Sequence, residues 1–259
     1  MKKKLLFVFA ILFTAPLWLN AQAKSIELKT NDTINRYDQN NVKIGYWEEK
    51  SGEMMMKGFY QNNIKIENWL TFYGNNMLSK LEYFSNGIKN GISLQFDRKG
   101  KITQIEYYKG GLLHGTSVTY NQFSESPTTE INYANGKKNG VTRLYYDNNK
   151  LQEESYYKDD LKNGLSMWFN KTGRTIAINS YKIGLFDGAQ KTFYENDSLQ
   201  TLVIYKDNVM TGTYKEFYRN GMVKVSGQYF NGLQDGAWTE YDETGKAIKV
   251  KKFKTGKEK

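Results

Sequence analysis

Hydrophobic and polar residues alternate along most of the chain, in short runs separated by turn-forming residues. One such run places its bulky apolar side chains at Leu165, Met167 and Phe169. A period of two is typical of a β-strand that buries one face. The runs are rich in Tyr, Phe, Thr and Ile and are bounded by Gly, Asn or Asp, which favour strands and tight turns. The pattern therefore predicts an all-β protein.

The alternating runs belong to a unit that recurs nine times between residues 41 and 256. We call the residue that follows each turn and its variable tripeptide the anchor of the unit. Successive anchors are separated by 22, 24, 24, 25, 24, 24, 24 and 24 residues. The anchors are Gly45, Glu67, Gly91, Gly115, Gly140, Gly164, Gly188, Gly212 and Gly236.

Two aromatic positions and one turn position recur at fixed distances from the anchors. The residue five after the anchor is aromatic in every unit except the first, which has Lys50. The residue seven before the next anchor is always aromatic, from Tyr60 to Tyr229. The residue four before it is Gly, Asn or Asp, which tolerate a positive φ. Each unit is therefore predicted to be one β-hairpin of about 24 residues.

A single hairpin is only marginally stable in water, so each unit needs its neighbours. The units are therefore expected to stack into one elongated sheet, a solenoid in which each hairpin contacts only adjacent hairpins. End units of such arrays are usually irregular. The first unit is two residues shorter than most and lacks its first aromatic residue.

The segment GAWTEYDETGK, residues 236 to 246, resembles the MORN repeat in its pattern G-x-W-x-x-Y-x-x-x-G-K. It is most similar to the variant found in many-copy bacterial proteins, some of which are catalogued as antitoxin-like. His114-Gly115 and the Asn-Gly pairs at 86, 135 and 231 also resemble that family's turn. The resemblance covers about 215 of the 259 residues. It implies a hairpin scaffold with protein–protein contacts, and membrane-lipid binding is often proposed for the family.

The first 23 residues have the pattern of a signal peptide. Lys2, Lys3 and Lys4 precede an apolar run from 5 to 19, and Ala21-Gln22-Ala23 fits a signal-peptidase site. We therefore expect export to the periplasm, the outer-envelope periphery or the medium. Without any Cys, lipoprotein attachment and disulfides are excluded. Residues 24–40 are expected to be a linker or a first irregular strand, and no transmembrane helix is expected in the mature chain.

The net charge of +10 is concentrated at the two ends of the chain. Three signal-peptide lysines account for +3, and residues 246–259 hold seven Lys and one Glu, or +6, which leaves about +1 for the body. A nucleic-acid groove is therefore not expected. The residues 246–259 form a predicted basic C-terminal tail, overlapping the last unit, whose candidate contacts are Lys249, Lys251, Lys252 and Lys254. Such a segment suits anionic lipid or polysaccharide, or keeps a sheet edge soluble.

Residues suited to catalysis or metal binding do not form a recognisable set. His114 is the only histidine, and Asn or Asp takes its place in most other units, so it is interpreted as a turn residue. Zinc ligands at a suitable spacing, calcium loops and phosphate-binding glycine loops are not found in the sequence. We expect no enzyme activity, no cofactor and no metal.

Tryptophan and tyrosine residues are the candidates for an interaction face. Trp47, Trp69, Trp238 and Tyr214 come two residues after their anchors, and Trp168 comes four after. This parity places all five on the sheet face opposite Phe169 and its equivalents. They are either an aromatic recognition platform or, for Trp47, Trp69 and Trp238, covers for the two ends of the stack.

These patterns together favour an exported, non-catalytic scaffold that binds another envelope or secreted protein. The alternative is a binder of cell-surface polymer or anionic lipid through the aromatic face and the basic segment. The oligomeric state is left open.

Overall fold

The computed structural model describes residues 33–259, and those residues contain strands and turns but no helix. The predicted signal peptide, residues 1–23, lies outside the described residues. The strands are β1 (Arg36–Tyr37), β2 (Lys43–Ser51), β3 (Met54–Gln61), β4 (Ile64–Phe72), β5 (Leu78–Ser85), β6 (Ile88–Phe96), β7 (Ile102–Lys109), β8 (Leu112–Leu113), β9 (Gly115–Tyr120), β10 (Pro127–Ala134), β11 (Lys137–Tyr145), β12 (Leu151–Lys158), β13 (Leu161–Phe169), β14 (Thr175–Lys182), β15 (Leu185–Phe193), β16 (Leu199–Lys206), β17 (Val209–Phe217), β18 (Val223–Phe230), β19 (Leu233–Tyr241), β20 (Ala247–Lys254) and β21 (Lys257–Glu258).

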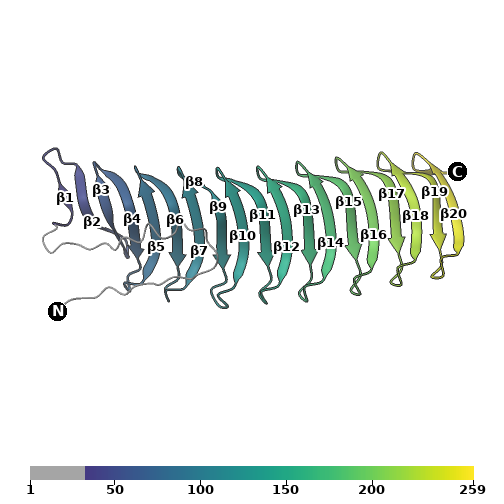
Figure 1. Ribbon diagram of the computed structural model, residues 1–259, viewed down its shortest axis with the longest axis horizontal. Helices are drawn as coiled ribbons and strands as arrows, with labels where there is room; N and C mark the ends of the chain where they lie inside the picture. Colours follow the sequence, from purple (N-terminus) through teal and green to yellow (C-terminus); the bar gives the residue numbers. More distant parts are fainter. Residues whose placement is uncertain (1–32) are drawn as a thin grey trace, which may run out of the picture. The chain divides into compact units, whose positions relative to one another are not determined.

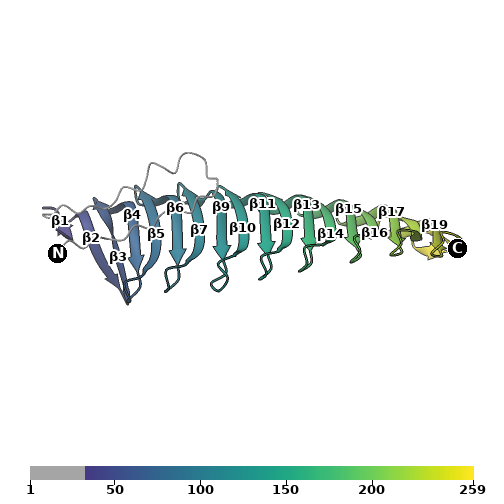
Figure 2. The same ribbon diagram turned by 60° about the horizontal axis from the view of Figure 1, so that its bottom comes forward.

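The strands pair antiparallel in chain order, except that β9 pairs with β7 instead of the two-residue β8, so the hairpins follow one another in sequence order (Figure 1). The sheet stays open, and residues 34–259 form one elongated layer of strands in both views (Figure 2). The predicted all-β solenoid of nine stacked hairpins in a single sheet is confirmed.

The turns between units join neighbouring hairpins through backbone hydrogen bonds. We call this side of the sheet the joining edge. There the residue four before each anchor donates its N–H to the carbonyl of the residue two before the previous anchor. Examples are Gly87 to Lys65 at 2.9 Å and Asp160 to Lys138 at 3.0 Å. A positive φ, +69° in Asp160, turns the N–H toward the neighbour. This geometry explains why only Gly, Asn and Asp occupy the position.

The turns inside units form the hairpin edge and use two kinds of side-chain bond. In turns of the form Tyr-x-Asn, the tyrosine hydroxyl and the asparagine amide donate to backbone carbonyls of the following unit. Tyr146 donates to Phe169 at 2.9 Å, and Asn148 donates to Lys171 at 2.8 Å. Where Asp or Asn replaces the tyrosine, its side chain accepts bonds within its own turn, as Asp97 does from Lys101 N–H at 2.9 Å.

The two faces of the sheet differ in what they bury. The anchor face carries the anchor, the residues two and four after it, and the aromatic residue opposite the anchor on the next strand, as in the pair Gly164 and Tyr181. The opposite face carries the residues one, three and five after the anchor. On the anchor face the position two after the anchor is buried in eight of the nine units. Most buried side chains therefore lie along the anchor face, and Tyr46 and Phe96 are buried on the opposite face.

The predicted basic tail is part of the sheet. Residues 247–254 form β20, which pairs with β19, for example Trp238 with Lys251, and β21 covers the last two residues of β20. The alternation Ala-Ile-Lys-Val-Lys is compatible with a strand whose lysines reach solvent, since long side chains can extend their ammonium groups into water. Residues 33–259 contain no segment that could cross a membrane as a helix.

Candidate functional site

The floor of the anchor face is the row of residues two after each anchor. Tyr214 alone among the nine is only partly buried. The others expose at most 9 % of their surface: Trp47, Trp69, Ser93, Ser117, Thr142, Ser166, Gln190 and Trp238. Large aromatic side chains occupy this row in the first two and last two units, and small or polar side chains occupy it between them.

Trp69 and Trp238 fit because a glycine lies beneath each ring. A Cβ added to Gly58 would lie 2.4 Å from the Trp69 ring, and one added to Gly227 would lie 2.3 Å from the Trp238 ring. Each indole N–H donates to a backbone carbonyl of that neighbouring strand, at 3.2 Å in both units. The glycine therefore provides the space, and the carbonyl fixes the ring orientation.

The rings of the first two units are covered by neighbouring side chains. Tyr60 meets both Trp47 and Trp69 edge to face, with centroid distances of 5.7 and 4.9 Å. The Lys65 ammonium lies 3.9 Å from the Trp69 centroid, and burial lowers the pKa of Lys65. Trp47 contacts Tyr37 at 4.9 Å. With 2–8 % exposure, Trp47, Trp69 and Trp238 offer no free ring face, which favours the end-covering interpretation over a recognition platform.

The middle of the floor holds a buried polar network between the fifth and sixth units. Ser155 donates to Glu153 Oε1 at 2.6 Å and lies 2.6 Å from Ser166 Oγ, and both serines are fully buried. Lys162 Nζ reaches the same Glu153 oxygen at 2.6 Å. The Lys162 ammonium also lies 5.2 Å from the centroids of Trp168 and Tyr181. Trp168 is thus partly exposed, with a cation close to its ring.

Tyr214 belongs to an aromatic cluster in the last two units. Its ring lies 5.2 Å from Trp238 and 5.8 Å from Tyr229, and burial is the main cause of its raised pKa. The structure therefore brings Tyr214 and Trp238 together. It separates them from Trp47 and Trp69 at the other end of the sheet, so the five aromatic candidates do not form one site.

The backbone at the anchor follows the size of the floor residue. Anchors followed by an aromatic floor residue have φ values between +59° and +74°: Gly45, Glu67, Gly212 and Gly236. Anchors followed by a small or polar one have φ between +89° and +118°: Gly91, Gly115, Gly140, Gly164 and Gly188. A φ near +60° is the left-handed region that a non-glycine residue can enter at moderate cost, so Glu67 is tolerated where it stands.

The family model of the MORN repeat variant matches this chain at residues 138–159, 186–207 and 210–231. The chain carries MORN repeats. Each matched segment begins two residues before an anchor and ends in the turn at the joining edge, so the MORN frame coincides with the structural unit. A search of curated proteins finds no match to the chain.

The MORN units also present a surface feature that the sequence reasoning missed. The residue three before the anchor is aliphatic in eight units. In the first unit it is the partly buried Val42. In the other seven it is 39–50 % exposed: Ile64, Ile88, Leu112, Leu161, Leu185, Val209 and Leu233. We call this row the aliphatic ladder. It lies at the joining edge, where Lys137 interrupts it. Its signal in the sequence is an Ile, Leu or Val three before the anchor in every unit except the fifth.

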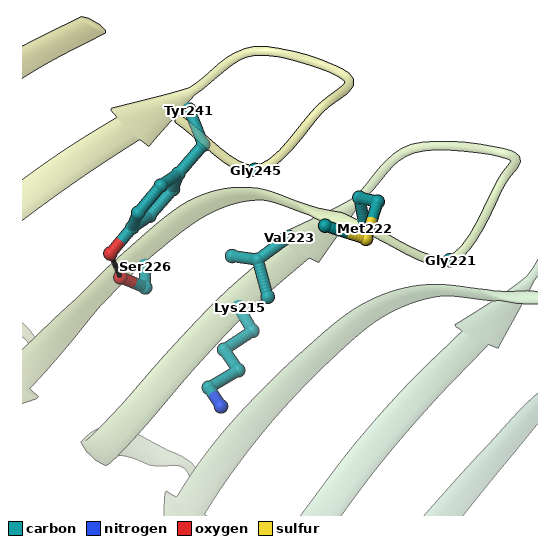
Figure 3. Close-up of a pocket in the computed structure, with 7 residues that line it drawn as sticks. All are labelled: Lys215, Gly221, Met222, Val223, Ser226, Tyr241 and Gly245. Atoms are coloured by element: carbon teal, nitrogen blue, oxygen red, sulfur yellow. Dashed lines mark hydrogen bonds between the residues drawn. The ribbon is translucent and has the colours of Figure 1, made fainter. Parts of the chain in front are cut away.

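Two open hollows lie on the MORN sheet. One, of about 410 Å³, adjoins the aliphatic ladder and is lined by Lys158, Asp159, Leu161, Asn163, Lys182 and Ile183. The other, of about 350 Å³, lies near the hairpin edge of the last two units (Figure 3). Its side-chain hydrogen bond joins Ser226 Oγ and the Tyr241 hydroxyl at 3.3 Å. In residues 33–259 no group of three or more His, Cys, Asp or Glu could hold a metal ion.

The predicted lysine contacts lie on β20. Lys251 pairs with Glu258 at 2.6 Å, while Ile248 and Val250 expose 61 % and 58 % of their surface. The structure thus joins Lys249, Lys251, Lys252 and Lys254 in one strand with two exposed aliphatic side chains.

Proposed function

We propose that this MORN-repeat protein is an exported, non-catalytic scaffold that binds another envelope or secreted protein along the sheet. The observation that carries the proposal is the aliphatic ladder. Single exposed aliphatic residues are ordinary on a protein surface, but seven at the same repeat position form a regular apolar row. A row with fixed spacing suits a partner that also presents apolar side chains at regular intervals.

The geometry of the ladder favours a protein partner over a small ligand. Successive ladder residues are two strands apart, or roughly 9.6 Å at about 4.8 Å per strand. The longer uninterrupted part runs from Leu161 through Leu185 and Val209 to Leu233, beside the 410 Å³ hollow. Backbone hydrogen bonds at the joining edge hold these turns in place, so little ordering is required on binding.

The test compares capture by two sets of three substitutions. Residues 24–259 are immobilised and exposed to solubilised envelope extract at moderate salt. We expect Leu161→Ser, Leu185→Ser and Leu233→Ser together to abolish capture of a discrete protein. The matched control, Met77→Ser, Ile176→Ser and Met222→Ser, removes exposed apolar side chains of 38–42 % exposure at or near the hairpin edge and should leave capture unchanged. Equal capture by both variants would refute the ladder as the binding surface.

Export has its own test. Fractionation of cells that produce the full chain should place it outside the cytoplasm with residues 1–23 removed. Retention of the full-length chain in the cytoplasm would contradict this part of the proposal.

The second candidate function is binding to anionic lipid or cell-surface polymer. The observation that favours it is β20, which combines four lysines with the exposed Ile248 and Val250. Such binding should fall steeply with salt and should be lost when Lys249, Lys251, Lys252 and Lys254 are all replaced by Ala. Capture that persists in salt and in this variant belongs to the ladder instead.

A further inference from the structure

The opposite face carries an apolar row across five neighbouring strands. The row consists of Leu70, Leu81, Leu94, Ile105 and Val118, each the cross-strand partner of the next. All five side chains remain partly exposed. A sheet face of this kind is normally covered by a second layer, and residues 33–259 supply none.

Charged residues border the row on both sides, in continuous cross-strand register. On the N-terminal side come Lys57, the partner of Leu70, and then Glu48, the partner of Lys57. On the C-terminal side come Glu130, the partner of Val118, and then Arg143, the partner of Glu130. These groups form ion pairs within the chain. Lys57 pairs with Glu48 at 2.9 Å, and Arg143 pairs with Glu130 at 3.4 Å and, at 2.7 Å, with Glu154, its cross-strand partner on the far side. They stay partly exposed, with side-chain exposures of 29–39 %.

The row of nine residues is complementary to its own reverse. Counted outward from Leu94, Leu81 corresponds to Ile105 and Leu70 to Val118. The next pair is Lys57 with Glu130, and the last is Glu48 with Arg143. Every charge therefore meets its opposite when the row is turned end for end about Leu94.

We propose that this face binds a second copy of the chain, face to face, around a two-fold axis that passes by Leu94 and runs parallel to the strands. That rotation reverses the order of the strands and keeps their direction, so β6 lies over β6 of the second copy. Leu70 then lies over Val118 of the other copy, and Lys57 lies over its Glu130. A two-fold interface requires such self-complementarity.

The charges also select between the two simplest face-to-face arrangements. A two-fold axis along the length of the sheet would place each strand over itself and oppose Lys57 to Lys57, Glu130 to Glu130 and Arg143 to Arg143. Like charges directly opposed across an interface are unfavourable. The arrangement that reverses the strand order replaces all of these repulsions by attractions.

The size of the row predicts a reversible dimer. Five strands at about 4.8 Å, each contributing roughly six residues at about 3.3 Å, cover about 480 Å² per copy, or about 1,000 Å² in the pair. Stable interfaces usually bury about 1,200–2,000 Å², so a dissociation constant in the micromolar range is expected. The equivalent row of later units is interrupted by Lys191 and Lys215 and shows no such symmetry.

Sedimentation and cross-linking test the proposal directly. Residues 24–259 should show a monomer–dimer equilibrium at micromolar concentration. Because the chain has no Cys, Leu94→Cys introduces a single thiol at the proposed axis, and a short bis-maleimide should link two copies through it. Met167→Cys, at the same repeat position outside the row, is the matched control and should not link. A chain that sediments as a monomer at about 1 mM, or equal linking by both variants, would overturn the proposal.

Charge reversal supplies the second arm. Lys57→Glu should weaken dimerisation at least tenfold, and adding Glu130→Lys to the same chain should restore it, because both reversed pairs are again complementary. Lys215→Glu, at an equivalent place on the same face, should have no effect. Loss without restoration, in variants whose circular dichroism is unchanged, would also overturn the proposed axis. The aliphatic ladder takes no part in this interface, so the capture experiment and the dimer experiment fail independently.

Discussion

The second unit and the sixth unit use the same backbone slot in opposite ways. In the second unit Trp69 fills the slot over Gly58, and its indole N–H bonds to the backbone of the neighbouring strand. In the sixth unit Ser166 lies across from Ser155, and Glu153 and Lys162 complete a buried polar network. Both slots are closed to solvent. Burial at this position therefore depends on the pair of residues across the strands rather than on either residue alone.

The comparison also shows how the repeat adjusts its backbone. The anchor φ is +59° at Glu67, beside Trp69, and +118° at Gly164, beside Ser166. An L-residue can adopt the first value at moderate strain, whereas the second is accessible essentially only to glycine. Units with an aromatic floor residue therefore do not require glycine at the anchor, whereas units with a serine floor residue do.

Removal of the large ring should have the largest effect. Trp69→Ala is expected to destabilise the protein by about 3–5 kcal/mol, because a wholly buried aromatic side chain is lost and Gly58 leaves a cavity. Denaturant unfolding followed by circular dichroism measures the change. Trp168→Ala, which removes a partly exposed ring, should cost clearly less. Equal losses would mean that the Trp69 slot is not part of the core.

Breaking the polar network should be the next largest effect. Glu153→Ala leaves the partly buried Lys162 ammonium without its carboxylate and removes the acceptor of the buried Ser155 hydroxyl, at a cost of about 2–4 kcal/mol. Glu216→Ala removes an acid whose partner Lys224 is 43 % exposed and should cost under about 1 kcal/mol. Thermal unfolding of the two variants separates these outcomes. A small loss of stability in Glu153→Ala would show that packing, and not the polar network, stabilises the pair Ser155 and Ser166.

A methyl group beneath the ring should have an intermediate effect. Gly58→Ala places a Cβ 2.4 Å from the Trp69 ring and should cost about 1–3 kcal/mol through overpacking. Gly74→Ala, whose nearest contact would be 3.4 Å, should be close to neutral. Combining Gly58→Ala with Trp69→Ser should cost less than the sum of the single changes. Additive losses would refute the pairing of the two positions.

Relief of backbone strain should have the smallest effect and the opposite sign. Glu67→Gly removes a side chain from a residue at φ +59° and is expected to stabilise the protein by at most about 1 kcal/mol, since the greater freedom of glycine in the unfolded chain offsets part of the gain. The reverse change, Gly164→Glu, should destabilise strongly at φ +118°. If Glu at position 164 cost no more free energy of unfolding than Glu at position 67, the difference in anchor φ would have no effect on stability.

The fold could be predicted from the sequence because the repeat period, the turn residues and the alternation of side chains all indicate the same stack of hairpins. The roles of individual residues could not be predicted from the sequence, because they depend on the neighbours of each residue across the strands. The burial of Trp69 requires Gly58, which is eleven residues away and becomes its neighbour only in the antiparallel register. The charge order around Leu94 likewise appears only when nine strands are aligned. The charge of residues 246–259 favours a solvated tail, whereas the alternation of side chains in residues 247–251 is that of the strand β20.

The tyrosine hydroxyls of the hairpin edge also divide the array mechanically. Tyr73, Tyr146, Tyr194 and Tyr218 each fasten their unit to the next, at 2.8–2.9 Å. At the third, fourth and sixth units Asp97, Asn121 and Asn170 accept bonds only within their own turns. Under tension along the sheet, the units joined by tyrosine should move as blocks, and the first separation should occur at a junction that lacks this bond. A protein that spans the distance between two partners would thereby have defined junctions at which its units separate first under force.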